Sequence, residues 1–559
     1  MNSLIIAVLA YVGFIIAYRT YGTYLSKRIF NLDPNRQTPA HEFEDGMDFV
    51  PTKKEILFGH HFTSIAGAAP IVGPAIAVMW GWVPALLWVV FGSIFMGAVH
   101  DFGALVLSAR HQGRSVSDIT KDLIGPRART LFLLLTMFAL LIVIAVFGLV
   151  IAVLFTSYPQ SVLPIWFEIP IAIAVGYYLY KKSGNSTLAG LVAVVLMYVF
   201  VIIGVYFPIE IPAFIGGNII YTWVVILLIY AYIASTLPVW VLLQPRDYIN
   251  SHQLYVGLGL MFLGLVVSHP PIVAPAVNMN VADGPAFLPF LFITIACGAL
   301  SGFHSMAASG TTVKQLDNET DAKAIGYGAM LMEGALAVMA ILAATAGFKS
   351  LEAWNGHYAS WAAASGLGAK VGAFVEGGAT FVNGLGIPLD IATGVLAVLV
   401  VSFASTTLDS ATRIQRYIIA ELAEDLNIKV FTKRHPATLL AVVSAFILAS
   451  INGGKGGLIL WPLFGATNQL MAGLALLVVT VWLLKLKKPT AIAMVPMIFI
   501  IFMTSWAMLI NVRNFIASGN TLLLVLSVLM IALEIWVIIE AIFVYSSTKK
   551  TIMDENIKA

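Results

Sequence analysis

The stretch FGHHFTSIAGAAPIVGP, residues 58–74, decides the fold of this chain. It lies inside an apolar run, 56–80, that is long enough to cross a membrane. Within this run Pro70 and Pro74 each remove a backbone donor, and Gly67 adds backbone freedom. Freed backbone groups at membrane depth are tolerated only beside other protein or a water-filled cavity. The stretch therefore predicts a discontinuous membrane helix beside a binding site.

A second apolar run, 288–312, contains a matching stretch, SGFHSMAASGT, at residues 301–311. The shared pattern is Gly-x-His-x5-Gly, with Gly59, His61 and Gly67 opposite Gly302, His304 and Gly310. Small residues also serve close helix packing, which is the alternative explanation. The two runs cross the membrane in opposite directions in the predicted topology, as an inverted repeat requires. We therefore expect paired breaks at 64–70 and 304–310, with the substrate between them.

The composition predicts that the rest of the chain is also embedded in a membrane. Of the 559 residues, 60% are hydrophobic and 11% are charged, with a mean hydropathy of +0.92. Soluble domains carry about 25% charged residues. Unbroken apolar runs predict an all-α membrane protein of about 15 transmembrane helices. The predicted spans are 2–18, 56–80, 82–109, 130–156, 162–180, 186–206, 219–243, 252–270, 288–312, 324–347, 388–411, 436–451, 458–484, 490–511 and 520–545.

The positions of the basic residues predict the orientation. With the N-terminus outside, no Lys or Arg falls inside a predicted span, and the outer loops hold only four of the 31. These four are Lys349, Lys370, Lys455 and Arg513. Because basic residues concentrate in cytoplasmic loops, we predict an outside N-terminus and a cytoplasmic tail at 546–559. We expect a multi-pass protein of a bacterial cytoplasmic (inner) membrane.

Taken end to end, the chain resembles the carbon starvation protein family of bacterial peptide and pyruvate transporters. The stretches that carry the resemblance are GHHFTSIAGAAP (59–70), HDFG (100–103), QPRDY (244–248) and WPLFGATNQ (461–469). Segments 58–114, 301–347 and 395–420 are also similar in pattern to core helices of alanine–cation symporters. This more distant likeness implies the five-plus-five inverted-repeat (LeuT-like) core of the APC superfamily, with discontinuous core helices 1 and 6 and additional helices.

The resemblance also implies a domain organisation. One transmembrane transporter domain would span 1–545, with the inverted-repeat core at 56–484 and extra C-terminal helices at 490–545. Two helices must be inserted in the core, and the sequence does not locate them. Residues 348–387 would form an extracellular cap that acts as a lid, with an idle loop as the alternative.

The candidate substrate-binding residues lie in the two matching stretches. They are His60, His61, Ser64, Gly67, His304, Ser305, Ser309 and Gly310. The N–H groups at the start of a half-helix carry partial positive charge, so a carboxylate can bind there without a buried Lys or Arg. We expect His61 and His304, at equivalent positions in the two stretches, to approach each other. The alternative for each histidine is a hydrogen bond to a neighbouring helix.

Residues 402–410, SFASTTLDS, predict a polar face on one helix, because residues three and four apart are neighbours. Hard cations prefer oxygen ligands. Sodium-coupled members of the wider fold therefore imply a sodium site. The ligands of the sodium ion would be the carbonyls of Ala66, Ala69 and Ser402 and the hydroxyls of Ser405 and Thr406. The alternative is that these hydroxyls bond their own backbone or a neighbouring helix.

Ionisable residues inside spans are functional candidates by default. For proton coupling the candidates are His100, Asp101, Glu333 and Asp409. Histidine titrates near neutrality and can pass protons. A structural pairing of His100 with Asp101 is the alternative to a relay.

Together these features predict a proton- or sodium-coupled secondary transporter, not an enzyme, that imports a small carboxylate or short peptide by alternating access. Pyruvate or peptides are what the family resemblance implies. The alternatives are a channel or an intramembrane metalloenzyme, although a His-Glu-x-x-His helix is missing. The sequence has neither a Walker motif nor a basic stripe. We expect no cofactor, nucleotide or nucleic acid, and only a small-molecule substrate and the lipid bilayer as partners.

Overall fold

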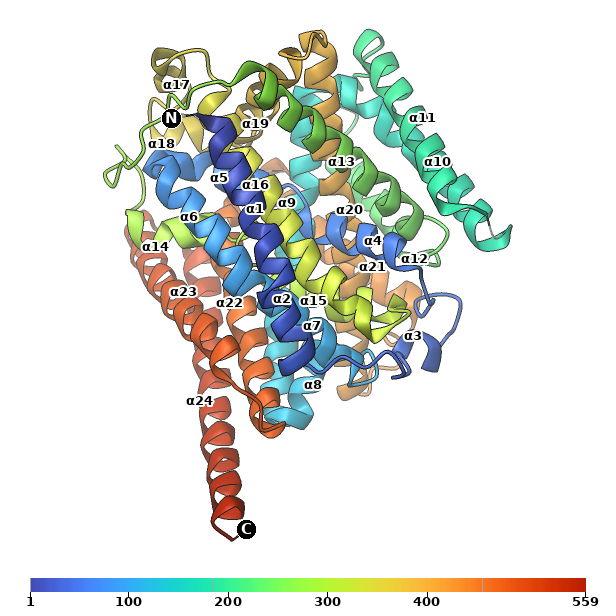
Figure 1. The fold of residues 1–559 in the computed structure, drawn as a ribbon, viewed down its shortest axis with the longest axis vertical. Coiled ribbons are helices and arrows are strands. Elements are labelled where there is room, and N and C mark those ends of the chain that lie inside the picture. Colours follow the sequence, from blue (N-terminus) through green and yellow to red (C-terminus); the bar gives the residue numbers. More distant parts are fainter. Residues whose placement is uncertain (1, 183, 455, 559) are drawn as a thin grey trace.

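The computed structural model describes residues 2–182, 184–454 and 456–558 (Figure 1). The regular elements in these residues are helices, and the only β-structure among them is two isolated bridges. In chain order the α-helices are α1 (Ser3–Arg19), α2 (Tyr21–Tyr24), α3 (Pro39–Glu42), α4 (Lys54–Ala66), α5 (Ala69–Ala77), α6 (Trp82–Gly92), α7 (Ala98–Ala109), α8 (Val116–Leu123), α9 (Pro126–Ser157), α10 (Val162–Lys181), α11 (Ser186–Tyr206), α12 (Ile219–Thr236), α13 (Leu243–Ser268), α14 (Phe287–Thr294), α15 (Gly302–Gly310), α16 (Ala329–Ala346), α17 (Leu351–His357), α18 (Trp361–Ala364), α19 (Leu367–Asn383), α20 (Leu389–Asp425), α21 (Arg434–Gly454), α22 (Gly456–Lys485), α23 (Ala491–Ser518) and α24 (Thr521–Lys558).

The helices confirm the prediction of an all-α membrane protein. Among the described residues, 13 helices are long and apolar enough to cross a membrane, or up to 14 with α4 and α5 counted as one bent span. The remaining predicted span, 288–312, consists of the short helices α14 and α15. The two termini lie at opposite ends of the molecule, as an odd number of crossings requires (Figure 1). Lys455, one of the predicted outer basic residues, lies outside the described residues.

Helices α9, α20 and α22 form the middle of the molecule. Helix α9 packs against α20, α22, α12 and α21, and α20 also contacts α4, α13 and α19. Two groups of helices flank this centre in Figure 1: α10 and α11 on one side, and α23 and α24 on the other. Almost all residues of the half-helices α5 and α15 are buried, whereas α14 lies at the edge of the molecule with about half of its residues partly exposed.

The first break is confined to Gly67 and Ala68, where the chain bends by 43° between α4 and α5. Gly67 has φ +52°, a conformation that side chains disfavour, and a Cβ there would lie 2.7 Å from Thr407 Oγ1. Pro70 falls in the first turn of α5, where its missing N–H has no partner to lose. Pro74 lies inside α5 and does not end it. Because α4 continues to Ala66 and α5 begins at Ala69, the break is narrower than the predicted 64–70.

The predicted position of the second break, 304–310, is wrong. These residues form helix α15, and the break lies at 295–301, where Gly298 has φ +90°. The Asn468 side chain accepts a hydrogen bond from the Phe303 N–H at 2.9 Å and so fixes the start of α15. The Ser305 and Ser309 hydroxyls donate to carbonyls within α15 instead of interrupting it.

The two breaks nevertheless face each other. A Cβ on Gly298 would lie 3.4 Å from Pro70 Cβ, and one on Gly73 would lie 2.4 Å from the Thr294 carbonyl oxygen. The predicted repeat equivalence of His61 and His304 is wrong, because His61 precedes its break and His304 follows the other. Both still come near each other, because α4 and α15 pack together.

The predicted cap, 348–387, is helical. It comprises α17, α18 and α19, and α19 packs against α16, α20, α13 and α5. The Tyr358 hydroxyl donates to the Ala75 carbonyl at 2.7 Å, and the Trp361 ring lies 4.9 Å from the Trp80 ring between centroids. The segment is thus attached to the half-helix α5. Its role as a lid stays a prediction.

We predict that Gly67→Ala destabilises the protein by about 2 kcal/mol, because a side chain at this left-handed position is strained by about 1–2 kcal/mol and its Cβ would also press on Thr407. Thermal unfolding of the purified protein measures the effect. The control is Gly148→Ala in α9, where a Cβ meets nothing within 4 Å and alanine favours the helix. Equal melting temperatures for the two variants would contradict the strained break.

Candidate functional site

The residues His304, Asp101, His100 and Glu333 form a fully buried polar cluster beside the second break, here called the His304 cluster. His304 on α15 faces Asp101 on α7, with 2.9 Å between Nδ1 and Oδ2. Its other ring nitrogen lies 3.3 Å from Oε2 of Glu333 on α16. Asp101 also meets the neighbouring His100, Nδ1 to Oδ1, at 2.7 Å. Three helices therefore bring two carboxylates to the two nitrogens of one imidazole.

Hydrogen bonds tie this cluster to the backbone of the second break. The Gly298 N–H donates to Oε1 of Glu333 at 3.0 Å. Asn468 of α22 donates to the Ser301 hydroxyl at 2.9 Å and accepts from Phe303 N–H. The freed backbone groups thus receive side-chain partners, which is the condition for a break at membrane depth. The charge on Glu333 and the conformation of the break are linked through one hydrogen bond.

The His304 cluster places two carboxylates beside two histidines in a fully buried region. Two ionised carboxylates buried without a cation are strongly disfavoured. A doubly protonated His304 would donate to Asp101 and to Glu333 at once and neutralise one of them. Neutralising the second requires another proton or cation. The pairing of His100 with Asp101, which the sequence left as a structural alternative, is present in this same network.

His61 and Ser64 hold α4 against other elements at the break. The His61 Nδ1 lies 2.9 Å from the Thr312 hydroxyl, which follows α15. The Ser64 hydroxyl lies 3.0 Å from the Ser410 hydroxyl of α20, and the Thr407 hydroxyl donates to the Ser64 carbonyl at 3.2 Å. The face of α20 that meets the first break is therefore that of Thr407 and Ser410.

A second buried cluster, here called the Asp409 cluster, consists of Asp409, Arg246, Tyr230, Asp247 and His60. Arg246 pairs with Asp409, and the Tyr230 hydroxyl donates to the same carboxylate at 2.9 Å. Arg246 also lies 3.5 Å from Asp247, which meets His60 Nδ1 at 2.6 Å. His60 therefore belongs to the Asp409 cluster, whereas its neighbour His61 contacts Thr312.

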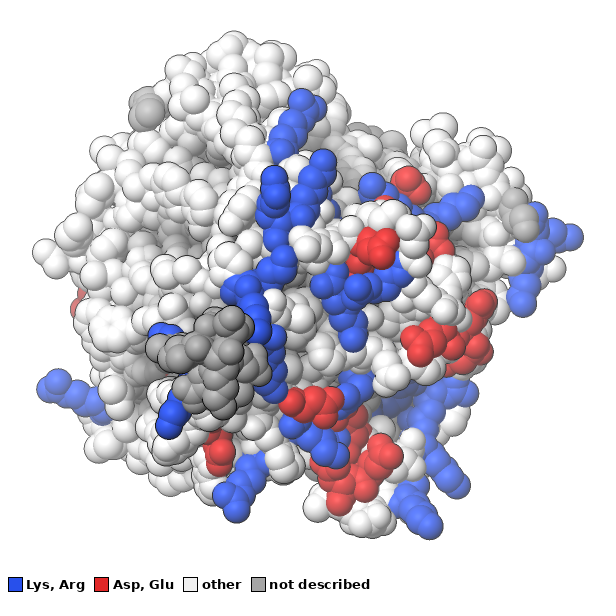
Figure 2. Space-filling model, turned by 60° about the horizontal axis from the view of Figure 1, so that its bottom comes forward, with Lys and Arg blue, Asp and Glu red and all other residues white. Residues whose placement is uncertain are grey.

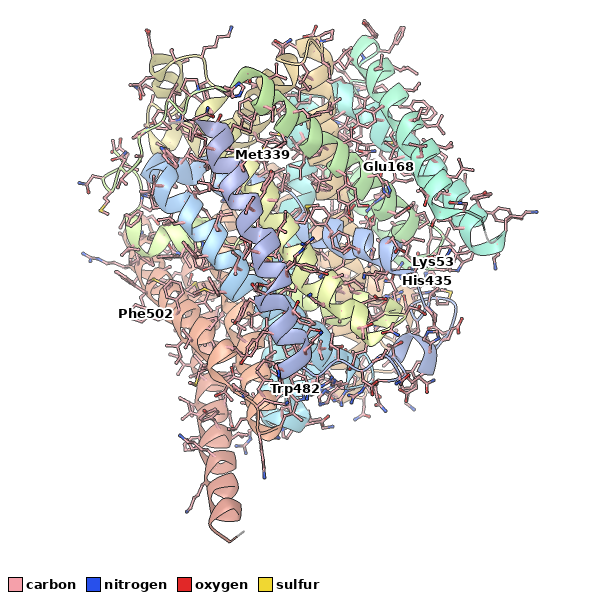
Figure 3. All side chains as sticks on the ribbon, in the orientation of Figure 1. Lys53, Glu168, Met339, His435, Trp482 and Phe502 are labelled. Atoms are coloured by element: carbon pink, nitrogen blue, oxygen red, sulfur yellow. The ribbon has the colours of Figure 1, made fainter. Side chains whose placement is uncertain are left out.

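The expectation that no basic residue lies within a span is wrong. Arg246 is 2% exposed on α13, which begins at Leu243 rather than at 252. The QPRDY stretch falls between the predicted spans 219–243 and 252–270, although its charges are matched by partners from α4 and α20. Glu168 of α10, which is labelled in Figure 3, is also buried. It lines a cavity of about 20 Å³ together with Arg246 and Ser405. The sequence signal for these residues was their ionisable character alone.

The structure divides the predicted sodium ligands between two places. Ala66 and Ala69 line a small cavity at the breaks, together with Thr407. Ser405 lies at the Glu168 cavity and donates to the Val401 carbonyl. The Thr406 hydroxyl donates to the Ser402 carbonyl at 3.1 Å and accepts from Asn250 of α13. The five residues do not converge on one point, because the 402–406 face is turned toward α13 and away from the break.

The predicted substrate residues divide in the same way. His61, Ser64, Gly67 and His304 lie around the two breaks, and Ser305 is one residue further along α15. His60 belongs to the Asp409 cluster, whereas Ser309 accepts from the Val116 N–H and Gly310 packs on Ile414. The cavity between the breaks has a volume of about 10 Å³, which is the size of a single water site. The protein is therefore closed around its centre.

Cys297, His304 and Glu333 also bring potential metal ligands together. One ligand atom from each lies within 4.8 Å of the others, and all three residues are buried. His304 already has a carboxylate within ion-pair distance of each ring nitrogen, so charge pairing accounts for the same geometry without an ion.

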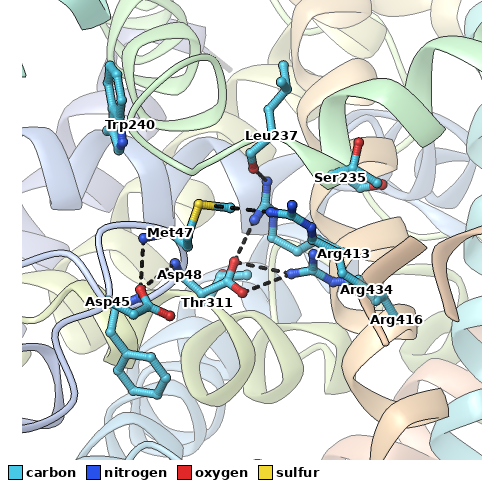
Figure 4. A network of polar contacts seen from close by, with 12 residues as sticks. Asp45, Met47, Asp48, Ser235, Leu237, Trp240, Thr311, Arg413, Arg416 and Arg434 are labelled. Carbon is cyan, nitrogen blue, oxygen red and sulfur yellow. Dashed lines mark hydrogen bonds and ion pairs between the residues drawn. The ribbon is translucent and has the colours of Figure 1, made fainter. Parts of the chain in front are cut away.

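Segment 43–53, between α3 and α4, lies against α20 and against the chain that leaves α15. Figure 4 shows Asp48 against two buried arginines of α20, 2.6 Å from Arg413 Nη1 and 3.1 Å from Arg416 Nη2. The Val50 N–H donates to the Lys314 carbonyl and the Thr52 N–H to the Gln315 carbonyl, both at 3.1 Å. The segment therefore joins α20 to the chain that leaves α15.

Electrostatic attraction stabilises the contact of segment 43–53 with α20. Burial would raise the pKa of Asp48, but Arg413 and Arg416 outweigh it and lower that pKa. Burial lowers the pKa of Lys314 to about 8, although Asp48 opposes the shift. The Lys314 ammonium lies 3.6 Å from the centroid of the Tyr417 ring. Asp48 is thus ionised at neutral pH and holds the segment in place.

Charged side chains gather on the face that comes forward in Figure 2, the end at which α24 leaves the molecule. This distribution agrees with the predicted concentration of basic residues on one side of the membrane. Which side of the membrane this face occupies stays a prediction.

Fold and site together define a multi-span integral membrane protein with two facing broken helices. The chain belongs to the carbon starvation protein CstA family, whose model matches residues 2–364 and 351–507. It is 34% identical to the peptide transporter CstA of Campylobacter jejuni, over 90% of this chain and 79% of that protein. It is 32% identical to the pyruvate/proton symporter BtsT of Escherichia coli, over 91% of this chain and 81% of that protein. The fold is similar to that of MhsT in complex with L-phenylalanine, with a TM-score of 0.50, 12% identity, and coverage of 89% of this chain and 99% of MhsT.

That likeness confirms the predicted LeuT-like core with additional helices. The family resemblance seen in the sequence is confirmed as well.

We predict that Asp48→Asn speeds maleimide labelling of Cys297, the single cysteine of the chain, on the order of tenfold. The substitution leaves Arg413 and Arg416 without their carboxylate, and because Asp48 is partly exposed we expect the closed state to lose about 1.4 kcal/mol, which corresponds to tenfold. Cys297 lies at the second break and is 5% exposed, so labelling reports access to the centre. Glu44→Gln, an exposed residue of the same segment, is the control. Unchanged labelling would show that segment 43–53 does not close the path.

Proposed function

We propose that this protein is a cation-coupled secondary transporter that imports a small carboxylate or a short peptide. The observation that carries the proposal is the His304 cluster, an acid–histidine network whose Glu333 accepts a hydrogen bond from the Gly298 N–H of a broken helix. Such a network gives a bound proton a direct effect on the backbone that faces the substrate. The proton is our preferred coupling ion.

The coupling step follows from this hydrogen bond. An ionised Glu333 accepts strongly from Gly298 N–H and attracts a protonated His304. A proton on Glu333 weakens both interactions, so the segment 295–301 is released from α16. Binding of the proton therefore favours a different position of the second break. By linkage, substrate that prefers this position binds the proton more tightly.

The substrate class rests on the half-helices and on the relatives. Helices α5 and α15 both begin at the breaks, and the N–H groups at a helix start attract a carboxylate. Curated relatives are named peptide transporter and pyruvate/proton symporter, and both substrates carry a carboxylate. The centre is too small for either substrate in this conformation, so we infer that access alternates between two sides of the membrane.

Sodium remains the alternative coupling ion. The hydroxyls and carbonyls near α20 are oxygen ligands, as a hard cation requires. Ser405 and Thr406 were the predicted ligands, but Thr407 and Ser64 lie closer to the first break. A sodium site at the break would therefore use Thr407 rather than Ser405.

We expect proteoliposomes containing the protein to accumulate pyruvate, or di- and tripeptides, above the outside concentration when an inward proton gradient is imposed. A symporter concentrates its substrate and a channel cannot, so the steady-state level distinguishes the two. Separate pH and sodium gradients identify the ion. Equilibration without accumulation under either gradient would contradict coupled transport.

We predict that Glu333→Gln lowers proton-driven accumulation on the order of tenfold or more, whereas exchange of internal for external substrate is largely retained. The glutamine cannot gain or lose a proton, and coupling energies of this kind are typically 5- to 150-fold. Glu376→Gln, an exposed carboxylate on α19, is the matched control.

A double variant distinguishes proton coupling from sodium coupling. Ser405→Ala with Thr406→Ala should leave proton-driven uptake intact, because these hydroxyls face α13 and the Glu168 cavity. A loss of sodium-dependent uptake in this double variant, with Glu333→Gln fully active, would contradict the assignment of coupling to the His304 cluster.

A further inference from the structure

An apolar cavity of about 740 Å³ lies on the side of the molecule, far larger than the spaces at the breaks. Its walls are aliphatic and aromatic side chains from α1, α4, α13 and α16. In Figure 1, α1 crosses the front of the molecule with α16 and α13 beside it. The volume falls within the range of about 300–1,000 Å³ that ligand pockets have. The cavity can therefore hold a sizeable apolar molecule.

The cavity occupies one half of the membrane thickness. Along α1 its lining runs from Tyr11 to Arg19, eight residues or about 12 Å of helix. The hydrocarbon core of a bilayer is about 30 Å thick, so this length matches a single leaflet. Ile15, which lines the cavity, is 54% exposed, so the cavity is open to the surroundings of α1. Membrane lipid therefore has direct access.

Two cations stand at one end of the cavity. Arg19 is the only charged residue among those that line it, and it is exposed at the end of α1. Lys323 precedes the lining residue Ala324, and its ammonium lies 4.3 Å from the centroid of the Tyr18 ring. It donates to the Thr23 hydroxyl at 2.8 Å. Within the described ranges, neither cation has a carboxylate within ion-pair distance.

The nearby acidic residue does not neutralise this end. Asp321 lies two residues before Lys323, but its carboxylate is 3.6 Å from Lys54. Arg19 and Lys323 are thus left facing the end of an apolar cavity. A molecule that matches both the apolar walls and the two cations has a hydrocarbon chain and an anionic headgroup.

We propose that this cavity is a binding site for one anionic phospholipid, with an acyl chain between α1, α13 and α16 and the phosphate at Arg19 and Lys323. Basic residues near a membrane surface attract anionic lipids by about fivefold each. The end of α1 is on the predicted cytoplasmic side, where such lipids concentrate. A second protein copy would offer an apolar surface, which leaves the two cations unmatched.

The site lies against the moving parts of the proposed transport cycle without depending on it. Phe58 of α4 lines the cavity, three residues before His61. Met332 and Ala335 of α16 line it as well, on a different face of the helix from the buried Glu333. A bound lipid thus contacts both α4 and α16.

Filling the cavity tests the proposal. A Cβ on Gly259, a lining residue of α13, meets nothing within 4 Å, so Gly259→Leu is chosen to place a side chain in the cavity. Gly13→Leu is the control, since Gly13 of α1 has equally open space but does not line the cavity. Native mass spectrometry of the purified protein with added phosphatidylglycerol should show one retained lipid in the control and in the unaltered protein, and at least tenfold less in Gly259→Leu.

The headgroup is tested separately with phosphatidylglycerol against phosphatidylcholine. The unaltered protein should prefer phosphatidylglycerol, and Arg19→Gln with Lys323→Gln should lower that preference on the order of 10- to 30-fold. Lys433→Gln, an exposed residue elsewhere, should not. Equal retention of lipid by Gly259→Leu and Gly13→Leu, or equal retention of the two lipids, would overturn the proposal. A dimer that only Gly259→Leu abolishes would also overturn it, in favour of a second copy.

Discussion

The structure depends on the need to satisfy backbone groups that two membrane helices release at the centre of the protein. In hydrocarbon no water replaces a lost helix bond, so each freed N–H or carbonyl must find a protein partner. Glu333 supplies one to Gly298, Asn468 supplies one to Phe303, and Thr407 donates to the Ser64 carbonyl. These partners come from α16, α22 and α20. The packing of the long helices around the breaks is therefore a consequence of the breaks themselves.

Charge is buried in the same region, in two clusters separated by α4. His61 faces the chain after α15, near the His304 cluster, whereas His60 faces Asp247 in the Asp409 cluster. Consecutive residues of a helix point about 100° apart, so one half-helix reaches both. Any movement of α4 must change the surroundings of both clusters together. The two clusters are thus mechanically connected although no residue is shared between them.

The closed centre and the closure below it belong together. The space at the breaks is the size of one water molecule, and segment 43–53 covers the neighbouring end through Asp48 and the arginines of α20. Ion pairs of this kind can be exchanged for water when the segment moves away. A transporter requires such a reversible closure, because a permanently packed centre would admit nothing.

The sequence by itself determined the membrane spans, the first break and the set of ionisable residues. Hydropathy is a property of each segment alone, and Gly67 followed by Pro70 ends a helix whatever surrounds it. The tertiary structure decided the rest. The second break lies at 295–301 rather than at the predicted 304–310, because Asn468, more than 150 residues away, fixes where α15 begins. The tertiary structure also placed Arg246 inside the protein and turned Thr407 rather than Ser405 toward α4. A buried charge or a hydroxyl is positioned by partners from distant segments, and no local pattern contains those partners.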